Sequence, residues 1–460
     1  MEIEFAGAAR EVTGSCHLVR VNGRTIALDF GLFQGRRAET EARNRAMPCD
    51  VRELAAVVLS HAHIDHAGRL PLLVREGYTG AIWTTPATRD LCGIMLADAA
   101  HIQEKDAEYL TRRNKAHADP LYTMRDAARA VEQMLSVPFR RRVQIVDGVH
   151  LTFLEAGHIL GSASVMLEVS EAGRERRLVF SGDIGRSGLP IIRDPEPPAG
   201  ADVVIMESTY GNRDHPALED AQSRLAEIVS LTAARGGKLL IPAFAVGRTQ
   251  ELVYDLHALA RAGRIPEIPI YIDSPLAIDA TSVFELHPDI FDRSEHLVQE
   301  AAELFRFPMV RYTRDVTESK ALNTQRGPMV VIAASGMAES GRILHHLAHG
   351  AGDPRNTILI VGFMAEHTLG RRILERAPVI RVFGDEVPLR AGVEVLNGYS
   401  AHADRRDLRA WLHAVRARGT APERVFLVHG EADAQDALAE VLRGDGFGVS
   451  IPSRGDRFTA

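Results

Sequence analysis

A short apolar strand that runs directly into a cluster of histidines constrains this fold more than any other feature. Residues 57–59 (Val-Val-Leu) are typical of a buried strand, and His61, His63, Asp65 and His66 follow it. Imidazole and carboxylate groups bind zinc and similar divalent cations. Four such groups in one loop exceed what a single tetrahedral ion takes from adjacent positions. We therefore expect His61 and His63 at one ion. Asp65 and His66 turn toward a second.

The same arrangement recurs along the chain. Six apolar strands, the first included, end at or just before a His, Asp or Glu. The side chains that follow the later strands are His158, Asp183, Glu207, His402 and His429. In a layered sheet such strand ends share one rim, where irregular backbone lines a cleft. The pattern predicts one site built from distant parts of the chain.

Composition limits the class of protein. A length of 460 residues, with 45% apolar and 25% charged residues, is typical of a globular protein of two or three domains. No apolar run approaches the ~20 residues of a membrane span, so no membrane association is expected. Cys16, Cys49 and Cys92 are odd in number and far apart, which favours a reducing cytoplasm. The net charge of −7 means that a polyanion would have to meet a local basic surface or metal ions.

A self-contained α/β pattern occupies the middle of the chain. Strands alternate with helices from residue 211 to about residue 388, which indicates a parallel or mixed sheet covered on both faces. Because possible metal ligands lie on both sides of it, this segment is expected to be an insertion. We predict a discontinuous metal domain of residues 1–209 and 390–460, and an inserted domain of residues 210–389.

Some turns of the insert could hold phosphate through backbone amides at helix starts. The turn at Ser335 and Gly336 is the best candidate, and Arg248 and Thr368 are further candidates for phosphate contact. Small residues also serve ordinary turn geometry, so both interpretations remain open. Asp29, at the end of an early strand, is expected to support the metal loop by hydrogen bonding and not to bind metal; bracing a turn is the alternative.

Taken together, the motifs resemble those of the metallo-β-lactamase superfamily and its β-CASP ribonuclease branch. The motifs occur in order along the chain: 61–66, His158, Asp183, 207–211, 399–404 and 427–431. Within that branch the chain looks most similar to the nuclease subunit of the eukaryotic cleavage and polyadenylation complex and its prokaryotic homologues. The resemblance implies an α/β fold: a four-layer αββα metal domain with an inserted β-CASP domain, and RNA cleavage between them. It also implies that His429 accompanies RNA-directed rather than DNA-directed members.

The resemblance carries over a ligand set and a mechanism. The first ion would be held by His61, His63 and His158, the second by Asp65, His66 and His429, with Asp183 bridging both. Two Zn²⁺ ions are expected, with Mn²⁺ as the alternative. A hydroxide held by the pair would attack the phosphodiester and leave 5′-phosphate and 3′-hydroxyl ends. His402 would act as the general acid, held by Glu207, so that the expected catalytic residues are His402, Glu207, Asp65 and Asp183.

One motif departs from the family, and several alternatives stay open. Where the family often has Gly, His367 stands in the late insert motif, and it could narrow the phosphate path or contact RNA. Single-stranded RNA is the expected substrate, with a homodimer or a processing complex as the expected assembly. Endonuclease and 5′→3′ exonuclease action are both open. The rival functions are a small-molecule metallohydrolase of the thioesterase or lactonase type, a non-catalytic RNA-binding subunit, and a DNA nuclease.

Overall fold

The structure is a computed structural model, and it describes residues 1–35, 37–114, 118–216, 218–292, 303–362, 364 and 367–459. The chain forms two compact units, one of Met1–Asp214 with His402–Ala460 and one of His215–Ala401. The predicted domain ranges, 1–209 with 390–460 and 210–389, stay a prediction, because a compact unit and a domain need not coincide. Strand β19 (Gly392–Val395) pairs with β16 (Thr357–Ile360) inside the second unit.

Two seven-stranded sheets form the first unit. The strands of the first sheet, in spatial order, are β22 (Arg457–Thr459), β1 (Glu2–Phe5), β2 (His17–Val21), β3 (Arg24–Leu28), β4 (Leu54–Val58), β5 (Ala81–Thr84) and β6 (Met134–Ser136). Those of the second are β21 (Val449–Ser450), β20 (Arg424–Val428), β11 (Val203–Glu207), β10 (Arg174–Phe180), β9 (Ala163–Glu171), β8 (Val149–Glu155) and β7 (Val143–Val146). Hydrophobic side chains of both sheets pack into one core, as Val58, Phe153 and Phe426 illustrate.

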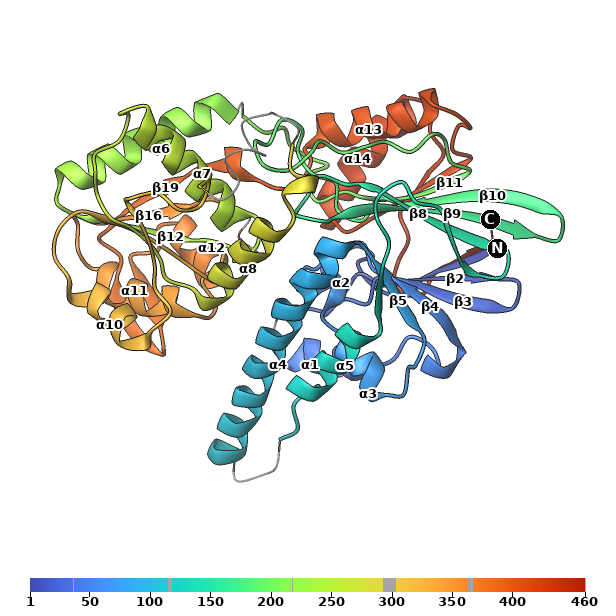
Figure 1. Cartoon of the computed structure of the whole chain (residues 1–460), viewed down its shortest axis with the longest axis horizontal. Coiled ribbons are helices and arrows are strands. Elements are labelled where there is room, and N and C mark those ends of the chain that lie inside the picture. The colour runs from blue at the N-terminus through green and yellow to red at the C-terminus, as the bar shows by residue number, and fades with distance from the viewer. Residues whose placement is uncertain are drawn as a thin grey trace. The chain divides into compact units, whose positions relative to one another are not determined.

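Helices cover the outer face of each sheet in this unit, as Figure 1 shows. Beside the first sheet lie α1 (Arg37–Arg45), α2 (Ile64–Ala67), α3 (Leu70–Arg75), α4 (Pro86–Asn114) and α5 (Met124–Glu132). Beside the second lie α13 (Arg405–Ala417) and α14 (Ala432–Gly444), whose apolar faces bury Trp411 and Leu438 against β11 and β20. Burial of apolar surface at the three interfaces between these four layers is the main force that holds the unit together. The predicted four-layer αββα arrangement is confirmed.

The second unit has a six-stranded sheet in which every pairing is parallel. Its order is β14 (Val310–Tyr312), β13 (Ile270–Ile272), β15 (Met329–Ala333), β12 (Lys238–Pro242), β16 and β19, and β17 (Val379–Val382) pairs with β18 (Asp385–Pro388) in a separate hairpin. The helices of this unit are α6 (Leu218–Ala234), α7 (Arg248–Arg261), α8 (Pro275–Leu286), α10 (Val316–Thr324), α11 (Arg342–Gly350) and α12 (Leu369–Leu374). A parallel or mixed sheet was predicted for this α/β segment, and the sheet is parallel. Short 3₁₀ turns at Val51–Glu53, Pro288–Ile290 and Asn397–Tyr399 complete the described elements.

Candidate metal centre

The ends of neighbouring parallel strands bring the predicted ligands of the first unit together. Strand β11 pairs in parallel with both β10 and β20, so the carboxyl ends of all three lie at one edge of the sheet. Asp183, Glu207 and His429 stand at or just after these ends. The loop after β4, in the facing sheet, supplies His61 and His63. All seven predicted ligands fall into groups whose donor atoms lie within 4.8 Å of one another.

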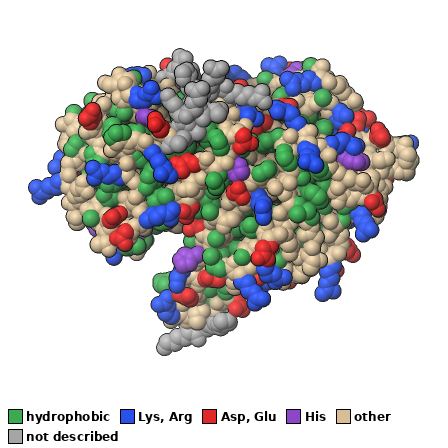
Figure 2. Space-filling view, in the orientation of Figure 1, with side chains coloured by type: hydrophobic (Ala, Val, Ile, Leu, Met, Phe, Trp, Pro, Cys, Tyr) green, Lys and Arg blue, Asp and Glu red, His purple; other side chains and the backbone are tan. Residues whose placement is uncertain are grey.

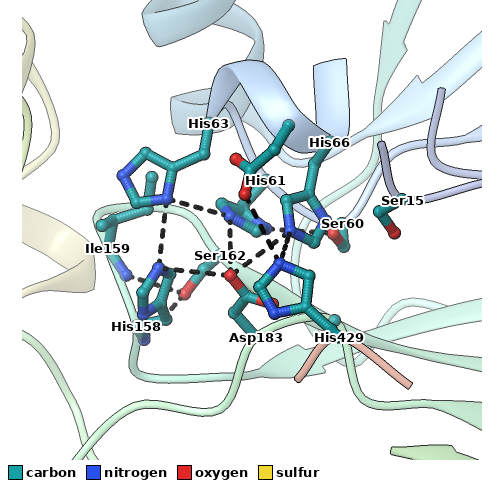
Figure 3. A network of polar contacts seen from close by, with 12 residues as sticks. Ser15, Ser60, His61, His63, His66, His158, Ile159, Ser162, Asp183 and His429 are labelled. Atoms are coloured by element: carbon teal, nitrogen blue, oxygen red, sulfur yellow. Dashed lines mark hydrogen bonds and ion pairs between the residues drawn. The ribbon is translucent and has the colours of Figure 1, made fainter. Parts of the chain in front are cut away.

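The first group consists of three histidines around one carboxylate oxygen. His63 Nδ1 lies 3.2 Å from His61 Nε2 and 3.1 Å from His158 Nε2. Asp183 Oδ2 lies 3.4 Å from His61 Nε2 and 3.6 Å from His158 Nε2. Figure 3 shows the rings of this group turned toward Asp183. The four donors thus enclose one small polar space.

The second group uses the same carboxylate oxygen from the other side. His66 Nε2 lies 3.3 Å from Asp183 Oδ2 and 3.1 Å from His429 Nε2. His429 Nε2 lies 3.4 Å from Asp65 Oδ2. Both Asp65 and His66 belong to the single turn of α2, whose first residue follows His63. Asp183 therefore has one carboxylate oxygen that adjoins both groups.

These donor atoms fit divalent metal ions. Metal–nitrogen bonds of about 2.0–2.1 Å place neighbouring ligands of a tetrahedral zinc ion about 3.3–3.4 Å apart, and the separations found here run from 3.1 to 3.6 Å. The buried Asp183 Oδ1 has no hydrogen-bond partner among the described residues. Buried carboxylate atoms without partners are rare unless a cation or water satisfies them. The donor set is thus that of a metal centre.

The electrostatics of the centre favour cations. Burial raises the pKa of Asp183, but the surrounding imidazoles, His429 first, outweigh burial and hold that pKa well below its ordinary value. Burial lowers the pKa of His61 well below its ordinary value, which leaves the neutral ring that binds metal. Burial opposes charge on His66, yet the Asp183 and Asp29 carboxylates raise its pKa well above the usual range.

Asp29 lies directly behind the second group. Its carboxylate accepts a hydrogen bond from His66 Nδ1 at 2.6 Å, and others from the Ser60 backbone N–H at 2.8 Å and the Ser15 hydroxyl at 3.1 Å. A carboxylate behind a ligating histidine fixes the ring and the tautomer. Asp29 is fully buried and has a left-handed backbone with φ of 59°. Asp29 is thus placed to hold the His66 ring through a hydrogen bond. Its predicted role in supporting a metal ligand stays a prediction.

A third cluster adjoins the two groups. His402 Nδ1 lies 3.1 Å from Glu207 Oε1 and 4.0 Å from Asp183 Oδ2. Glu207 is fully buried and also accepts the Ile184 backbone N–H at 2.7 Å. Burial lowers the pKa of His402, but the charge and hydrogen bond of Glu207 outweigh it and raise that pKa to about 9. Glu207 thus favours the charged form of the ring.

Comparisons with known proteins identify the family. Residues 9–232 match the metallo-beta-lactamase superfamily, residues 249–373 the Beta-Casp domain, and residues 386–452 the Zn-dependent metallo-hydrolase RNA specificity domain. The Ribonuclease TTHA0252 of Thermus thermophilus is 40% identical over 99% of both chains. The chain belongs to the Beta-Casp branch of the metallo-β-lactamase superfamily. The match to the Zn-dependent metallo-hydrolase RNA specificity domain and the donor groups described above both support the use of metal.

More distant members of the superfamily also match along the chain. The Transcription termination factor FttA of Pyrococcus abyssi is 32% identical over 99% of this chain and 71% of its own. The Endoribonuclease ysh1 of Schizosaccharomyces pombe is 28% identical over 96% of this chain and 56% of its own. A crystal structure of a protein of unknown function from Enterococcus faecalis superposes with a TM-score of 0.56 at 13% identity, covering 99% of both chains. That likeness shows the fold alone.

The residues predicted to contact phosphate lie in the second unit, which contains the residues that match the Beta-Casp domain. Ser335 follows β15, and its hydroxyl accepts the Glu339 backbone N–H at 3.3 Å. A Cβ at Gly336 would lie 2.7 Å from the Phe244 ring, so packing alone requires glycine there. The hydroxyl of Thr368 caps α12 by accepting the Arg371 N–H at 3.1 Å. Each residue thus has a structural task, and phosphate contact stays a prediction.

Arg248, the remaining residue predicted to contact phosphate, is buried and paired with a carboxylate. Arg248 is only 5% exposed, and its guanidinium donates to the equally buried Glu251 one turn further along α7. The Glu251 carboxylate neutralises the positive charge with which Arg248 would attract a phosphate. The predicted phosphate contact of Arg248 therefore stays a prediction, and its observed geometry does not favour it. His367 has a left-handed backbone with φ of 67°. Glu366 of the same motif lies outside the described residues.

Three supporting residues were not predicted from the sequence. The Ser60 hydroxyl lies 3.1 Å from His61 Nδ1, and the Ser162 hydroxyl accepts the His158 backbone N–H at 2.9 Å. Thr209 Oγ1 lies 3.1 Å from His429 Nδ1. In the sequence, each of these serine or threonine residues lies within four positions of a predicted ligand or of Glu207. Such residues are too common for that signal to be used without the fold.

Proposed function

We propose that this protein hydrolyses RNA phosphodiester bonds at a centre of two metal ions and leaves 5′-phosphate and 3′-hydroxyl ends. The chain is a hydrolytic nuclease by family membership, and its relatives include proteins named ribonuclease and endoribonuclease. The observation that carries the proposal is the shared Asp183 Oδ2, with three histidines on one side and His66 on the other. One oxygen between two donor groups is the arrangement expected of a bridging ligand.

Two Zn²⁺ ions, or Mn²⁺ in their place, are the proposed cofactors. His61, His63 and His158 would hold the first, Asp65, His66 and His429 the second, and Asp183 both. When bound, such a pair activates a water molecule near neutral pH and neutralises charge that develops on the phosphate. Zinc is favoured because five of the seven donors are imidazoles.

His402 supplies the proton in this proposal. Cleavage that leaves a 3′-hydroxyl requires a proton on the departing oxygen, and a protonated imidazole beside the centre can deliver it. Glu207 holds the ring through Nδ1 at 3.1 Å and keeps it charged at neutral pH. Asp65 and Asp183 contribute by holding metal and not by proton transfer.

RNA is the proposed substrate because of the relatives and not because of overall charge. The RNA specificity domain matches residues 386–452, which include His402 and His429. The net charge is −7, and Figure 2 shows acidic and basic side chains interspersed on the face it presents. Metal ions and local contacts would therefore have to hold the backbone. Single-stranded RNA, cytoplasmic location and assembly as a homodimer or with a processing complex remain predictions; none of the helices described could span a bilayer.

The test is product mapping with metal-replete protein. RNA labelled at either end, in linear and circular forms, should be cut to fragments with 5′-phosphate and 3′-hydroxyl ends. Cleavage of the circle shows endonuclease action, whereas cleavage of the linear form alone shows exonuclease action. A thioester and a lactone serve as comparison substrates. Their hydrolysis without RNA cleavage would establish the small-molecule alternative, and RNA binding without cleavage would establish the non-catalytic one.

A further inference from the structure

We infer that Thr209 is a positioning residue that fixes the tautomer of His429 and so presents Nε2 to the second metal ion. The inference rests on the proposed two-metal function and concerns a residue with no role in it so far. Thr209 Oγ1 lies 3.1 Å from His429 Nδ1. His429 Nε2 is the ring atom near the other donors of its group, 3.1 Å from His66 Nε2 and 3.4 Å from Asp65 Oδ2.

The hydroxyl of Thr209 has a second contact that decides its hydrogen-bond direction. Its Oγ1 lies 3.2 Å from the carbonyl oxygen of His429, to which it donates. A hydroxyl has a single hydrogen, and a carbonyl oxygen can only accept. With that hydrogen on the carbonyl, Oγ1 accepts from Nδ1–H of the ring. Nδ1, which also faces Asp183 Oδ1 at 3.5 Å, therefore carries the proton, and Nε2 keeps the lone pair that a metal requires.

The backbone around this contact is closely tied together. Glu207 pairs with Val428 at the ends of the parallel strands β11 and β20. Beyond them, the Ser208 hydroxyl donates to the Val428 carbonyl at 2.6 Å. A Cβ at Gly430 would lie 2.5 Å from the Ser208 hydroxyl, so only glycine allows this approach. The turn after β11 is thus held against the turn that carries His429.

The same short turn also reaches the proton donor. Glu207 binds His402 through Oε1, and its Oε2 accepts the Thr209 backbone N–H at 3.2 Å. Residues 207 and 209 therefore hold two different histidines, one proposed as the acid and one as a ligand. His429 itself has a left-handed backbone with φ of 48°, a conformation that non-glycine residues adopt only where the surroundings impose it. Thr209 is one of the contacts that impose it.

Metal binding tests the inference with a matched pair of variants. Thr209→Val keeps the shape and removes the hydroxyl, and Thr209→Ser keeps the hydroxyl. Metal-free protein is titrated with Zn²⁺ against a chromophoric chelator, and zinc-edge anomalous diffraction at limiting zinc assigns occupancy to each group. We expect Thr209→Val to lower the zinc affinity of the second group about 10–100-fold, the usual effect of losing a contact behind a ligating histidine. The first group should be unchanged, and Thr209→Ser should resemble wild type.

Controls separate this role from general disturbance of the turn. Ser208→Ala removes a neighbouring hydroxyl that donates to the Val428 carbonyl and not to the His429 ring, and because the pairing of β11 with β20 still holds the turn, it should not lower zinc affinity in the second group selectively. Thr209→Ala provides a second hydroxyl-free variant if Thr209→Val does not fold. Equal zinc affinity in wild type and the hydroxyl-free variants would overturn the inference, as would equal weakening of both groups. Fewer than two zinc ions in wild type would instead defeat the proposed two-metal function.

Discussion

The two donor groups share Asp183 but differ in what stands behind them. In the first group, the Ser60 hydroxyl backs His61 and the Ser162 hydroxyl holds the His158 loop, so that Asp29 reaches His61 only through Ser60, at 3.0 Å. In the second, the Asp29 carboxylate backs His66, and Asp65 adds a second negative charge at the rim of the group. The first group therefore resembles a neutral imidazole site, and the second is rich in carboxylate. Carboxylate donors suit harder ions such as Mn²⁺, so exchange of zinc for Mn²⁺ should begin in the second group.

Substitution of the shared residue should have the largest effect. Asp183→Ala removes the one oxygen that adjoins both groups, so both ions should be lost together. RNA cleavage should then fall by more than the ~10²–10⁴-fold that loss of a general acid costs. Elemental analysis of the purified variant checks the metal content. Two full equivalents of zinc would contradict the sharing of Asp183.

Loss of the proton donor should be large but should spare both groups. His402→Ala is expected to lower RNA cleavage ~10²–10⁴-fold with two ions still bound. Bis(p-nitrophenyl) phosphate is the matched substrate, because p-nitrophenolate leaves without a proton. Its hydrolysis should change little in this variant. A parallel fall for both substrates, or loss of metal, would show that His402 is not the acid.

Asp29→Asn tests the difference between the groups directly. The amide keeps the shape of Asp29 but weakens its hold on His66, which now donates to a carboxylate at 2.6 Å. We expect zinc affinity to fall about 10–100-fold in the second group and to fall less in the first, which Asp29 reaches only through Ser60. Site-resolved zinc occupancy measures this. Equal loss in both groups would mean that Asp29 supports the whole loop and not one ligand.

The smallest effect concerns stability near the first group. Glu155, at the end of β8, is 3% exposed, and burial raises its pKa to about 8. The folded chain keeps this proton after the unfolded chain has lost it, so the free energy of unfolding falls as pH rises from the ordinary carboxyl pKa toward 8. The slope contributed is at most ~1.4 kcal/mol per pH unit.

Comparison with a neutral variant isolates this contribution. Glu155→Gln should remove it, so that the variant gains stability relative to wild type between pH 5 and pH 8. Urea unfolding of both proteins without metal, at several pH values, gives the difference. A constant difference across that range would contradict a raised pKa for Glu155.

The clustering of the candidate ligands could be predicted from the sequence, but the residues behind them could not. His61 to His66 lie in one loop, and the later ligands follow apolar strands, so a shared rim could be inferred from strand ends alone. Thr209 contacts His429 only because β11 and β20 are neighbours in register, with Glu207 beside Val428. Pairing of strands more than 200 residues apart cannot be read from local patterns. For Arg248, a local pattern led to a prediction that the structure does not favour. A basic residue at a helix start suggested phosphate contact, but its guanidinium pairs with Glu251 one turn away.

Zinc-edge anomalous diffraction from crystals of the zinc-loaded wild-type protein tests the central claim most directly. The account predicts two peaks, one among His61, His63 and His158 and one among Asp65, His66 and His429, both beside Asp183. A single peak, or two peaks of which one lies away from Asp183, would contradict it.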